Sequence, residues 1–153
     1  MPDDTSLHLN RPTPAVGVVC FNAVGEVLLI QRGTPPRLGE WSIPGGRLEW
    51  GETVKAAALR ELMEETGVQA ELAGLIDVVD GIFTSRTSGE TTRHYVLIDF
   101  VARHIAGTPV AGDDAAQARF VPLDDLLQYS LWQDTLAIIA KGAAMLGLPN
   151  HAE

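Results

Sequence analysis

The sequence predicts a mixed α/β fold, in which helices cover the faces of one sheet. Valine-rich segments predict strands near the N-terminus, an Ala-, Leu- and Glu-rich segment predicts a helix, and helical patterning returns near the C-terminus. The length of 153 residues suits a single domain with a sizeable core. We expect this domain at residues 13–148, after a flexible arm at 1–12 and before a tail at 149–153.

The N-terminal elements form a hairpin followed by a loop. Residues 13–21 and 26–31 predict two strands, and the Asn-Ala-Val-Gly sequence at residues 22–25 predicts the turn between them. Residues 33–51 are dense in Gly and Pro, so they predict a long ordered loop or a set of short strands and turns. Because long loops in small domains are often functional, this segment is a candidate part of a site.

A helix is expected next, at residues 53–66, and Gly67 suits the left-handed position at its end. Residues 70–83 and 94–104 predict two further strands, joined by a polar loop at residues 84–92.

The last third of the chain returns to helix. Residues 107–117 predict a loop, residues 118–122 a short strand, and residues 123–146 one long final helix. The order of hairpin, loop, helix, strands and helix is typical of a sheet with helices on its faces.

Charge and composition exclude several classes of partner. The net charge of −9 makes the chain a poor ligand for duplex nucleic acid and for anionic membranes. No apolar run reaches the roughly 18–20 residues of a membrane span, and the N-terminus lacks the pattern of a secretory signal. A single cysteine, Cys20, forms neither an internal disulfide nor a Cys-based zinc site, so the cytosol is the expected compartment.

Three glutamates fall on one face of the central helix. Glu61, Glu64 and Glu65 have i, i+3 and i+4 spacing, and like charges so placed repel unless a cation intervenes. Carboxylate oxygens without clustered Cys or His suit Mg²⁺ or Mn²⁺ rather than zinc. The alternative is a solvated acidic face. The opposite face, expected to meet the core, carries Leu59, Leu62 and Met63.

Residues around the glutamates favour a walled site. Val54, Ala57 and Ala58 are small and lie on the glutamate side, where they allow another backbone to approach. Glu52 precedes the helix, with Thr53 as a candidate N-cap. From there Glu52 can bend back toward the other carboxylates or simply favour the positive end of the helix.

These residues form a recognisable motif. Gly46-x5-Glu52-x7-Arg60-Glu61-Leu62-x-Glu64-Glu65-x-Gly67-Val68 resembles the complete Nudix box, and the preceding Trp41–Gly46 segment is similar to the family's usual lead-in. The resemblance extends over most of the chain. It implies a Nudix-type α/β/α sandwich with a mixed sheet between helices. It also implies an enzyme that uses Mg²⁺ or Mn²⁺ to hydrolyse a nucleoside diphosphate linked to another moiety.

The resemblance also assigns roles within the box. Glu61, Glu64 and Glu65 would be metal ligands or a base acting with the metal, and Glu52 would lie close by, directly or through water. Arg60 would orient a glutamate by a fork-like hydrogen bond, the alternative being a surface ion pair.

The two glycines at the start of the box are candidates for substrate binding. Gly45 and Gly46 would let backbone approach the helix and the phosphates, unless they serve only a turn.

An acidic residue from a late loop is a further expected participant. Family members often use one as an extra ligand or base, and Glu90, Asp113 and Asp114 are the candidates here. Asp114 lies where a family-like segment usually has glutamate, and the shorter side chain leaves direct metal contact open. Either aspartate can instead be a solvated loop residue.

Residues for substrate contact are less specific. Arg32 and Arg47 are candidate phosphate ligands, with Arg37, Arg86 and Arg93 as weaker ones, although exposed arginines are common. Phe83 and Tyr95 could stack a base or belong to the core.

The box does not encode the substrate. Residues 44–52 are similar to those of proteins grouped with ADP-ribose pyrophosphatases, so an ADP-ribose-like substrate is favoured. The alternatives are a nucleoside triphosphate pyrophosphatase and a non-catalytic Nudix-fold sensor of nucleotide sugars. A homodimer agrees with the family likeness, but no residue pattern demands it.

Overall fold

The computed structural model describes residues 10–35 and 37–149, so most of the expected arm and tail lies outside the described residues. In chain order, the elements are β1 (Thr13–Phe21), β2 (Val27–Arg32), β3 (Trp41–Ser42), β4 (Gly45–Arg47), α1 (Val54–Thr66), β5 (Gln69–Thr84), β6 (Thr91–Ala106), β7 (Ala115–Val121), the 3-10 helix η2 (Leu123–Tyr129) and α2 (Gln133–Met145). No helix within the described ranges is long and apolar enough to cross a membrane.

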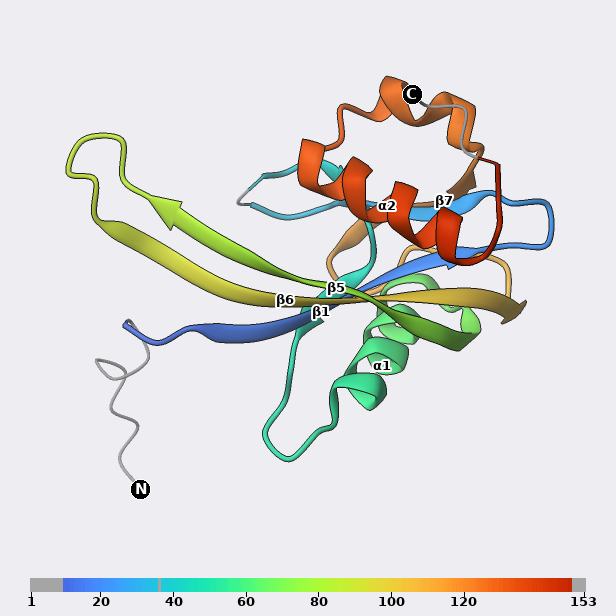
Figure 1. Cartoon of the computed structure of the whole chain (residues 1–153), viewed down its shortest axis with the longest axis horizontal. Helices are drawn as coiled ribbons and strands as arrows, with labels where there is room; N and C mark the ends of the chain where they lie inside the picture. Colours follow the sequence, from blue (N-terminus) through green and yellow to red (C-terminus); the bar gives the residue numbers. More distant parts are fainter. Residues whose placement is uncertain (1–9, 36, 150–153) are drawn as a thin grey trace.

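Strand β1 is the centre of a mixed sheet with the order β3-β2-β1-β6-β5. It pairs with β6 in parallel along its whole length, from Thr13 opposite Tyr95 to Phe21 opposite Arg103. Two strands pair antiparallel with different parts of β1: β2 pairs with its C-terminal end and β4 with its N-terminal half. Strand β7 pairs with β2, and the β5–β6 hairpin projects away from the helices (Figure 1).

The two-residue periodicity of β1 sends its side chains into two separate cores. Val16, Val18 and Cys20 pack in the core that includes residues of α1. Val19 and Phe21 pack in the core that includes residues of α2. The helices lie on opposite sides of the central strands in Figure 1. The expected α/β/α sandwich with a mixed sheet is confirmed.

The boundaries of the central helix follow its capping residues. The Thr53 hydroxyl accepts a hydrogen bond from the Ala56 amide at 3.1 Å, which makes Thr53 the N-cap. Gly67 has the left-handed φ of 71° and donates its amide proton to the Met63 carbonyl. Both residues act as the sequence predicted.

The prediction of one long final helix is wrong. The chain forms η2, then breaks at Ser130, whose φ is 52°, before α2 begins at Gln133. Leu126 and Leu131 are both buried in the α2-side core. On one continuous helix these two side chains would point about 140° apart, so burying both requires the break.

The other differences concern ends of strands. Strand β7 begins at Ala115, three residues before the expected start, because it pairs with β2 as far as Arg32 opposite Ala115. Strand β6 begins at Thr91, so the loop between β5 and β6 is shorter than expected.

Candidate active site

Strand β4 lies directly against helix α1, and its glycines make this approach possible. A Cβ atom at Gly46 would overlap the Glu61 carboxylate, and one at Gly45 would overlap the backbone of β1. On the helix, Ala57 and Ala58 are completely buried. Small residues on both elements therefore bring the backbone of β4 to the carboxylate side of the helix, as the sequence predicted.

This packing turns α1 differently from the expected orientation. Leu59 and Met63 were expected to face the core, and their side chains are 40% and 42% exposed. Leu62 is buried as expected, and Glu65, on the predicted acidic side, is only 9% exposed. The buried stripe thus runs between the two faces of the helix, because β4 covers part of the acidic side.

Arg60 is the centre of the carboxylate cluster. Its Nε donates to Glu52 Oε2 at 2.6 Å and its Nη2 to Glu52 Oε1 at 2.9 Å, which is a bidentate pair. Its Nη1 donates to Glu61 Oε1 at 2.8 Å and to Glu64 Oε2 at 3.1 Å. A further bond to the Arg47 carbonyl, at 3.0 Å, ties the guanidinium to β4. Glu52 therefore does bend back to the helix, and the guanidinium holds the pKa of its carboxyl below the usual value.

Glu65 is the most deeply placed of the four glutamates. Its Oε1 accepts the Gly45 amide proton at 2.8 Å. Burial raises the pKa of its carboxyl to about 8, more than the Gly45 hydrogen bond lowers it. The neighbouring charge of Glu61 raises it further, while that of Arg32 lowers it.

Glu61 lies between Arg60 and the Gly46 backbone. Its side chain is 12% exposed, and burial raises the pKa of its carboxyl despite the hydrogen bond from Arg60. Glu64 differs, because its side chain is 45% exposed. The pKa values of Glu61 and Glu65 are therefore raised mainly by burial, and a bound cation would stabilise the ionised form of both carboxyls.

The donor set fits a hard divalent cation, although the carboxylates do not converge on one point. Within the described ranges, no three acidic or imidazole side chains come close enough together to hold a metal. Arg60 engages Glu52, Glu61 and Glu64, and Glu65 is turned toward Gly45. Carboxylate oxygens on one helix face are nevertheless the ligands that Mg²⁺ and Mn²⁺ prefer.

Hydrogen bonds hold the late loop, between β6 and β7, against the end of α1. The Gly112 amide donates to the Glu65 carbonyl at 3.0 Å, and the Gly33 amide donates to the Asp114 carbonyl at 2.8 Å. Of the two aspartates, Asp113 is the one whose charge raises the pKa of both Glu61 and Glu65. The β5–β6 turn, which holds Glu90, projects away from α1 (Figure 1).

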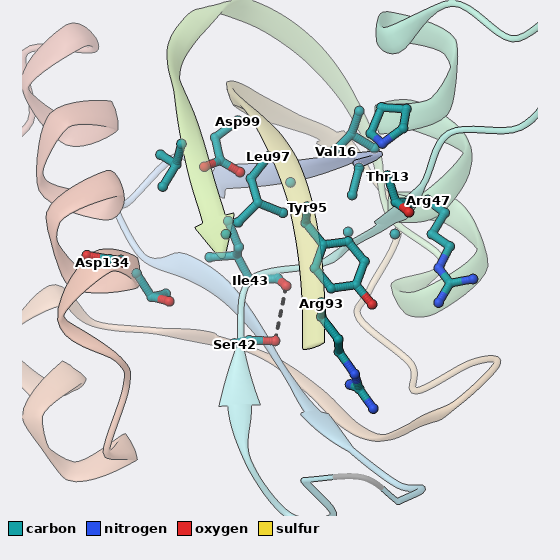
Figure 2. A pocket seen from close by; sticks show the side chains of 18 of the residues that line it. Thr13, Val16, Ser42, Ile43, Arg47, Arg93, Tyr95, Leu97, Asp99 and Asp134 are labelled. Atoms are coloured by element: carbon teal, nitrogen blue, oxygen red, sulfur yellow. Dashed lines mark hydrogen bonds between the residues drawn. The ribbon is translucent and has the colours of Figure 1, made fainter. Parts of the chain in front are cut away.

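A cavity of about 1340 Å³ opens beside the carboxylates. Glu65, Gly45, Gly46 and Arg47 line the end nearest to α1. Figure 2 shows the strand β6 side chains Asp99, Leu97 and Tyr95 following one another along this cavity, with Asp134 on the opposite side. The cavity therefore joins the buried end of the carboxylate cluster to the α2 face of the sheet.

Several candidate contact residues from the sequence line the same cavity. Arg32, Arg37, Arg47 and Arg93 do so, and the Arg37 guanidinium also lies 5.0 Å from the centre of the Trp132 ring. Among the aromatic residues, Phe83 and Tyr95 line it with their ring centres 6.4 Å apart, and Phe83 lies 6.0 Å from Trp132.

The cavity residues that sequence reasoning missed include Asp99, Trp132 and Asp134. For Asp99 a signal was present, since it is the one charged residue in the apolar run Tyr95–Ala102. For Trp132 and Asp134 the expected continuous helix obscured the signal, because they lie where η2 and α2 actually separate.

Known proteins share these features. The NUDIX domain model matches residues 11–141. A relative from Methanocaldococcus jannaschii named ADP-ribose pyrophosphatase is 38% identical over 120 residues, which cover 78% of this chain and 67% of the relative. One from Roseobacter denitrificans named RNA pyrophosphohydrolase is 32% identical over 128 residues, covering 75% and 79%.

A solved structure agrees with the sequence comparisons. The crystal structure of a MutT NUDIX hydrolase from Burkholderia pseudomallei superposes with a TM-score of 0.72 at 30% identity, covering 86% of this chain and 98% of that one. With the complete motif on α1 and the α/β/α architecture, these matches show that the chain belongs to the Nudix family and is a pyrophosphohydrolase.

Proposed function

We propose that this chain hydrolyses the diphosphate linkage of a nucleoside diphosphate attached to another moiety, with Mg²⁺ or Mn²⁺ as its metal. The observation that carries the proposal is the position of the largely buried Glu61 and the buried Glu65 against the Gly45–Gly46 backbone, beside a large cavity. The cavity exceeds the roughly 300–1000 Å³ of ordinary ligand pockets, so it has room for a nucleotide with a second group attached.

In the proposed site, Glu61, Glu64 and Glu65 would hold the metal, with Glu52 close by. The metal would neutralise the charge of the diphosphate and act as a Lewis acid at phosphorus. Arg60 would be a positioning residue, since its hydrogen bonds already orient Glu52, Glu61 and Glu64.

Among the carboxylates, Glu61 is the favoured proton acceptor, because Arg60 orients it against the Gly46 backbone and burial raises the pKa of its carboxyl. Asp114 remains a proposed auxiliary ligand or base from the late loop. The charge of Asp113 acts on Glu61 and Glu65, so it is the competing assignment.

Arg32 and Arg47 are proposed phosphate contacts. Both line the cavity, and the charge of Arg32 already acts on Glu65. Cations beside the carboxylates would offset the negative charge that this acidic chain otherwise presents to a phosphorylated substrate.

ADP-ribose is the first substrate to test, because a relative that aligns with 78% of the chain carries the name ADP-ribose pyrophosphatase. The relative from Roseobacter denitrificans carries the name RNA pyrophosphohydrolase. The two names therefore have in common only hydrolysis at a pyrophosphate, and not the rest of the substrate. A nucleoside triphosphate is the alternative substrate. A sensor that binds a nucleotide sugar without hydrolysis is the alternative from another class.

A product analysis separates these functions. The protein would be incubated with ADP-ribose, GDP-linked sugars, nucleoside triphosphates and a short 5′-triphosphorylated RNA in Mg²⁺ or Mn²⁺. Cleavage of ADP-ribose to AMP and ribose 5-phosphate, or of a GDP-linked sugar to GMP and a sugar phosphate, would support the proposal. Release of pyrophosphate from a triphosphate would favour the alternative enzyme. Tight binding without products, in both metals, would favour the sensor and contradict the proposal.

A further inference from the structure

Asp99 is a buried carboxylate with no partner among the described residues. It lies in the middle of strand β6, is 6% exposed and lines the cavity. In the part of the chain that the structure describes, no group donates a hydrogen bond to its side chain and no cation pairs with it. No side-chain oxygen that is completely buried lacks a partner among these residues, so the Asp99 oxygens face the cavity and are open to a ligand there.

The surroundings of Asp99 disfavour its charged form. Burial raises the pKa of its carboxyl to about 6, and the charge of Asp77 on the adjacent strand β5 adds to the effect. Lys141 forms an ion pair with Asp77 at 2.8 Å and not with Asp99. A fold that keeps an uncompensated acid in a cavity has the features of a functional site.

The neighbouring strand leaves room for this carboxylate. Gly17 on β1 is the parallel partner of Asp99, and a Cβ atom there would overlap Asp99 Oδ1. The side chain therefore leans across β1, where only a glycine accommodates it. This space and the unpartnered oxygens lie in the same cavity as the proposed diphosphate site.

Asp99 lies in the same row of the sheet as Gly45 of the proposed diphosphate site. Gly45 pairs with Gly17, and Gly17 pairs with Asp99, so the three residues form one row across the sheet. Strands are about 4.8 Å apart, so the backbones of Asp99 and Gly45 are about 10 Å apart, and the Asp99 carboxylate over Gly17 is nearer to Gly45 than that. The rings of Tyr95 and Phe83 line the same cavity and offer flat surfaces to a base.

We propose that Asp99 reads the nucleobase of the substrate and selects guanine-type bases over adenine. The inference rests on the proposed function, in which this cavity holds a nucleotide. A carboxylate has two acceptor oxygens and no donor. Guanine presents two adjacent donors, N1–H and the N2 amino group, on one edge. Adenine presents its amino group next to the acceptor N1, which would face a carboxylate oxygen. A guanosine diphosphate derivative therefore fits the cavity better than ADP-ribose does.

The test measures binding of GMP and AMP by calorimetry at pH 8 in buffer without metal, at nucleotide concentrations up to the millimolar range. We expect wild type to bind GMP at least about 10-fold more tightly than AMP. The Asp99→Asn variant should lose about 10- to 100-fold in GMP affinity, as expected for hydrogen bonds to a charged group, with no loss for AMP. Asp80→Asn is the matched control, because it removes the same charge from an exposed residue of the same cavity.

Unfolding in urea at pH 8 shows that a loss of binding is not a loss of folding. Asp99→Asn should be at least as stable as wild type, because it removes an unpaired buried charge. Asp134→Asn tests another acid of the cavity wall, on α2. A loss of GMP binding at Asp134 with none at Asp99 would overturn the inference.

Equal affinities of wild type for the two nucleotides, unchanged GMP binding in Asp99→Asn, or no binding of either would also overturn it. Monophosphate binding requires no hydrolysis, so this test and the product analysis can fail separately. GMP selection through Asp99 without any hydrolysis would contradict only the proposed function. Hydrolysis without a preference for the base would contradict only the role of Asp99.

Discussion

Glu65→Gln should stabilise the metal-free protein, although Glu65 belongs to the most specific motif of the chain. The carboxyl is 9% exposed and accepts one hydrogen bond, from the Gly45 amide at 2.8 Å. Glutamine has the same length and keeps an oxygen for that bond. The substitution removes an ionisable carboxyl whose charged form is unfavourable at this site, since burial raises the pKa of Glu65 from 4.5 to about 8.

The size and sign of the effect follow from linkage between proton binding and folding. Below about pH 4.5 the carboxyl is protonated in both the folded and unfolded states, so its pKa shift costs nothing. As the pH rises, the unfolded state loses its proton first, and the folded state is increasingly penalised until about pH 8. At about 1.36 kcal/mol per pH unit, the raised pKa of Glu65 lowers the unfolding free energy by at most about 3 kcal/mol at pH 7 and about 5 kcal/mol above pH 8. Water that reaches the carboxylate reduces this, so we expect about 2–4 kcal/mol.

The assay is urea unfolding in EDTA at pH 5, 7 and 8.5, for wild type and Glu65→Gln. The two proteins should have similar unfolding free energies at pH 5, and the variant should be the more stable at pH 8.5. Glu64→Gln is the matched control, because it removes the same charge from the same helix where the side chain is 45% exposed. A variant that is less stable than wild type at pH 8.5, or a difference independent of pH, would refute this account of the buried carboxyl.

Three further changes test neighbouring parts of the site. Glu61→Gln should lower kcat by roughly 10²- to 10⁴-fold while the protein stays folded, because this is the usual cost of losing a base or an electrostatic organiser. A change in kcat within about threefold would contradict the role of Glu61. Gly46→Ala should reduce the unfolding free energy by about 1–3 kcal/mol and lower kcat, because the added methyl overlaps the Glu61 carboxylate; an unchanged variant would show that β4 moves freely. Asp113→Asn should move the acidic limb of the pH–rate profile to lower pH, because it removes a charge that raises the pKa of Glu61 and Glu65. Asp114→Asn is its matched partner, and a fall in kcat there with none at Asp113 would assign the loop acid to Asp114.

The carboxylate cluster could be predicted from the sequence because helical spacing is a local property. Residues three and four apart share a face wherever the helix lies, so Glu61, Glu64 and Glu65 were certain to be neighbours once the helix formed. The bend of Glu52 toward Arg60 depended on the short turn before the helix, and the sequence left it open between two arrangements. In the structure Glu52 bends back to the helix, because Arg60 donates two hydrogen bonds to its carboxylate.

Features that depend on packing between distant segments could not be predicted. The helix was expected to bury Leu59 and Met63, but β4 covers the carboxylate side because Gly46 has no side chain. The final helix breaks at Ser130 so that side chains on both sides of the break reach one core. Whether Asp99 faces a cavity depends on strand register, which the sequence of β6 alone does not determine.

The most direct test of the central claim is the rate of diphosphate hydrolysis before and after metal removal, measured with the best substrate from the product analysis. In EDTA, wild type should lose its activity, and Mg²⁺ or Mn²⁺ added in excess should restore it. Glu61→Gln should remain slow at every metal concentration, because it lacks a carboxylate of the proposed site. Full hydrolysis by wild type in EDTA, with cleavage at the same bond, would contradict the claim that the carboxylates of α1 act through a divalent metal.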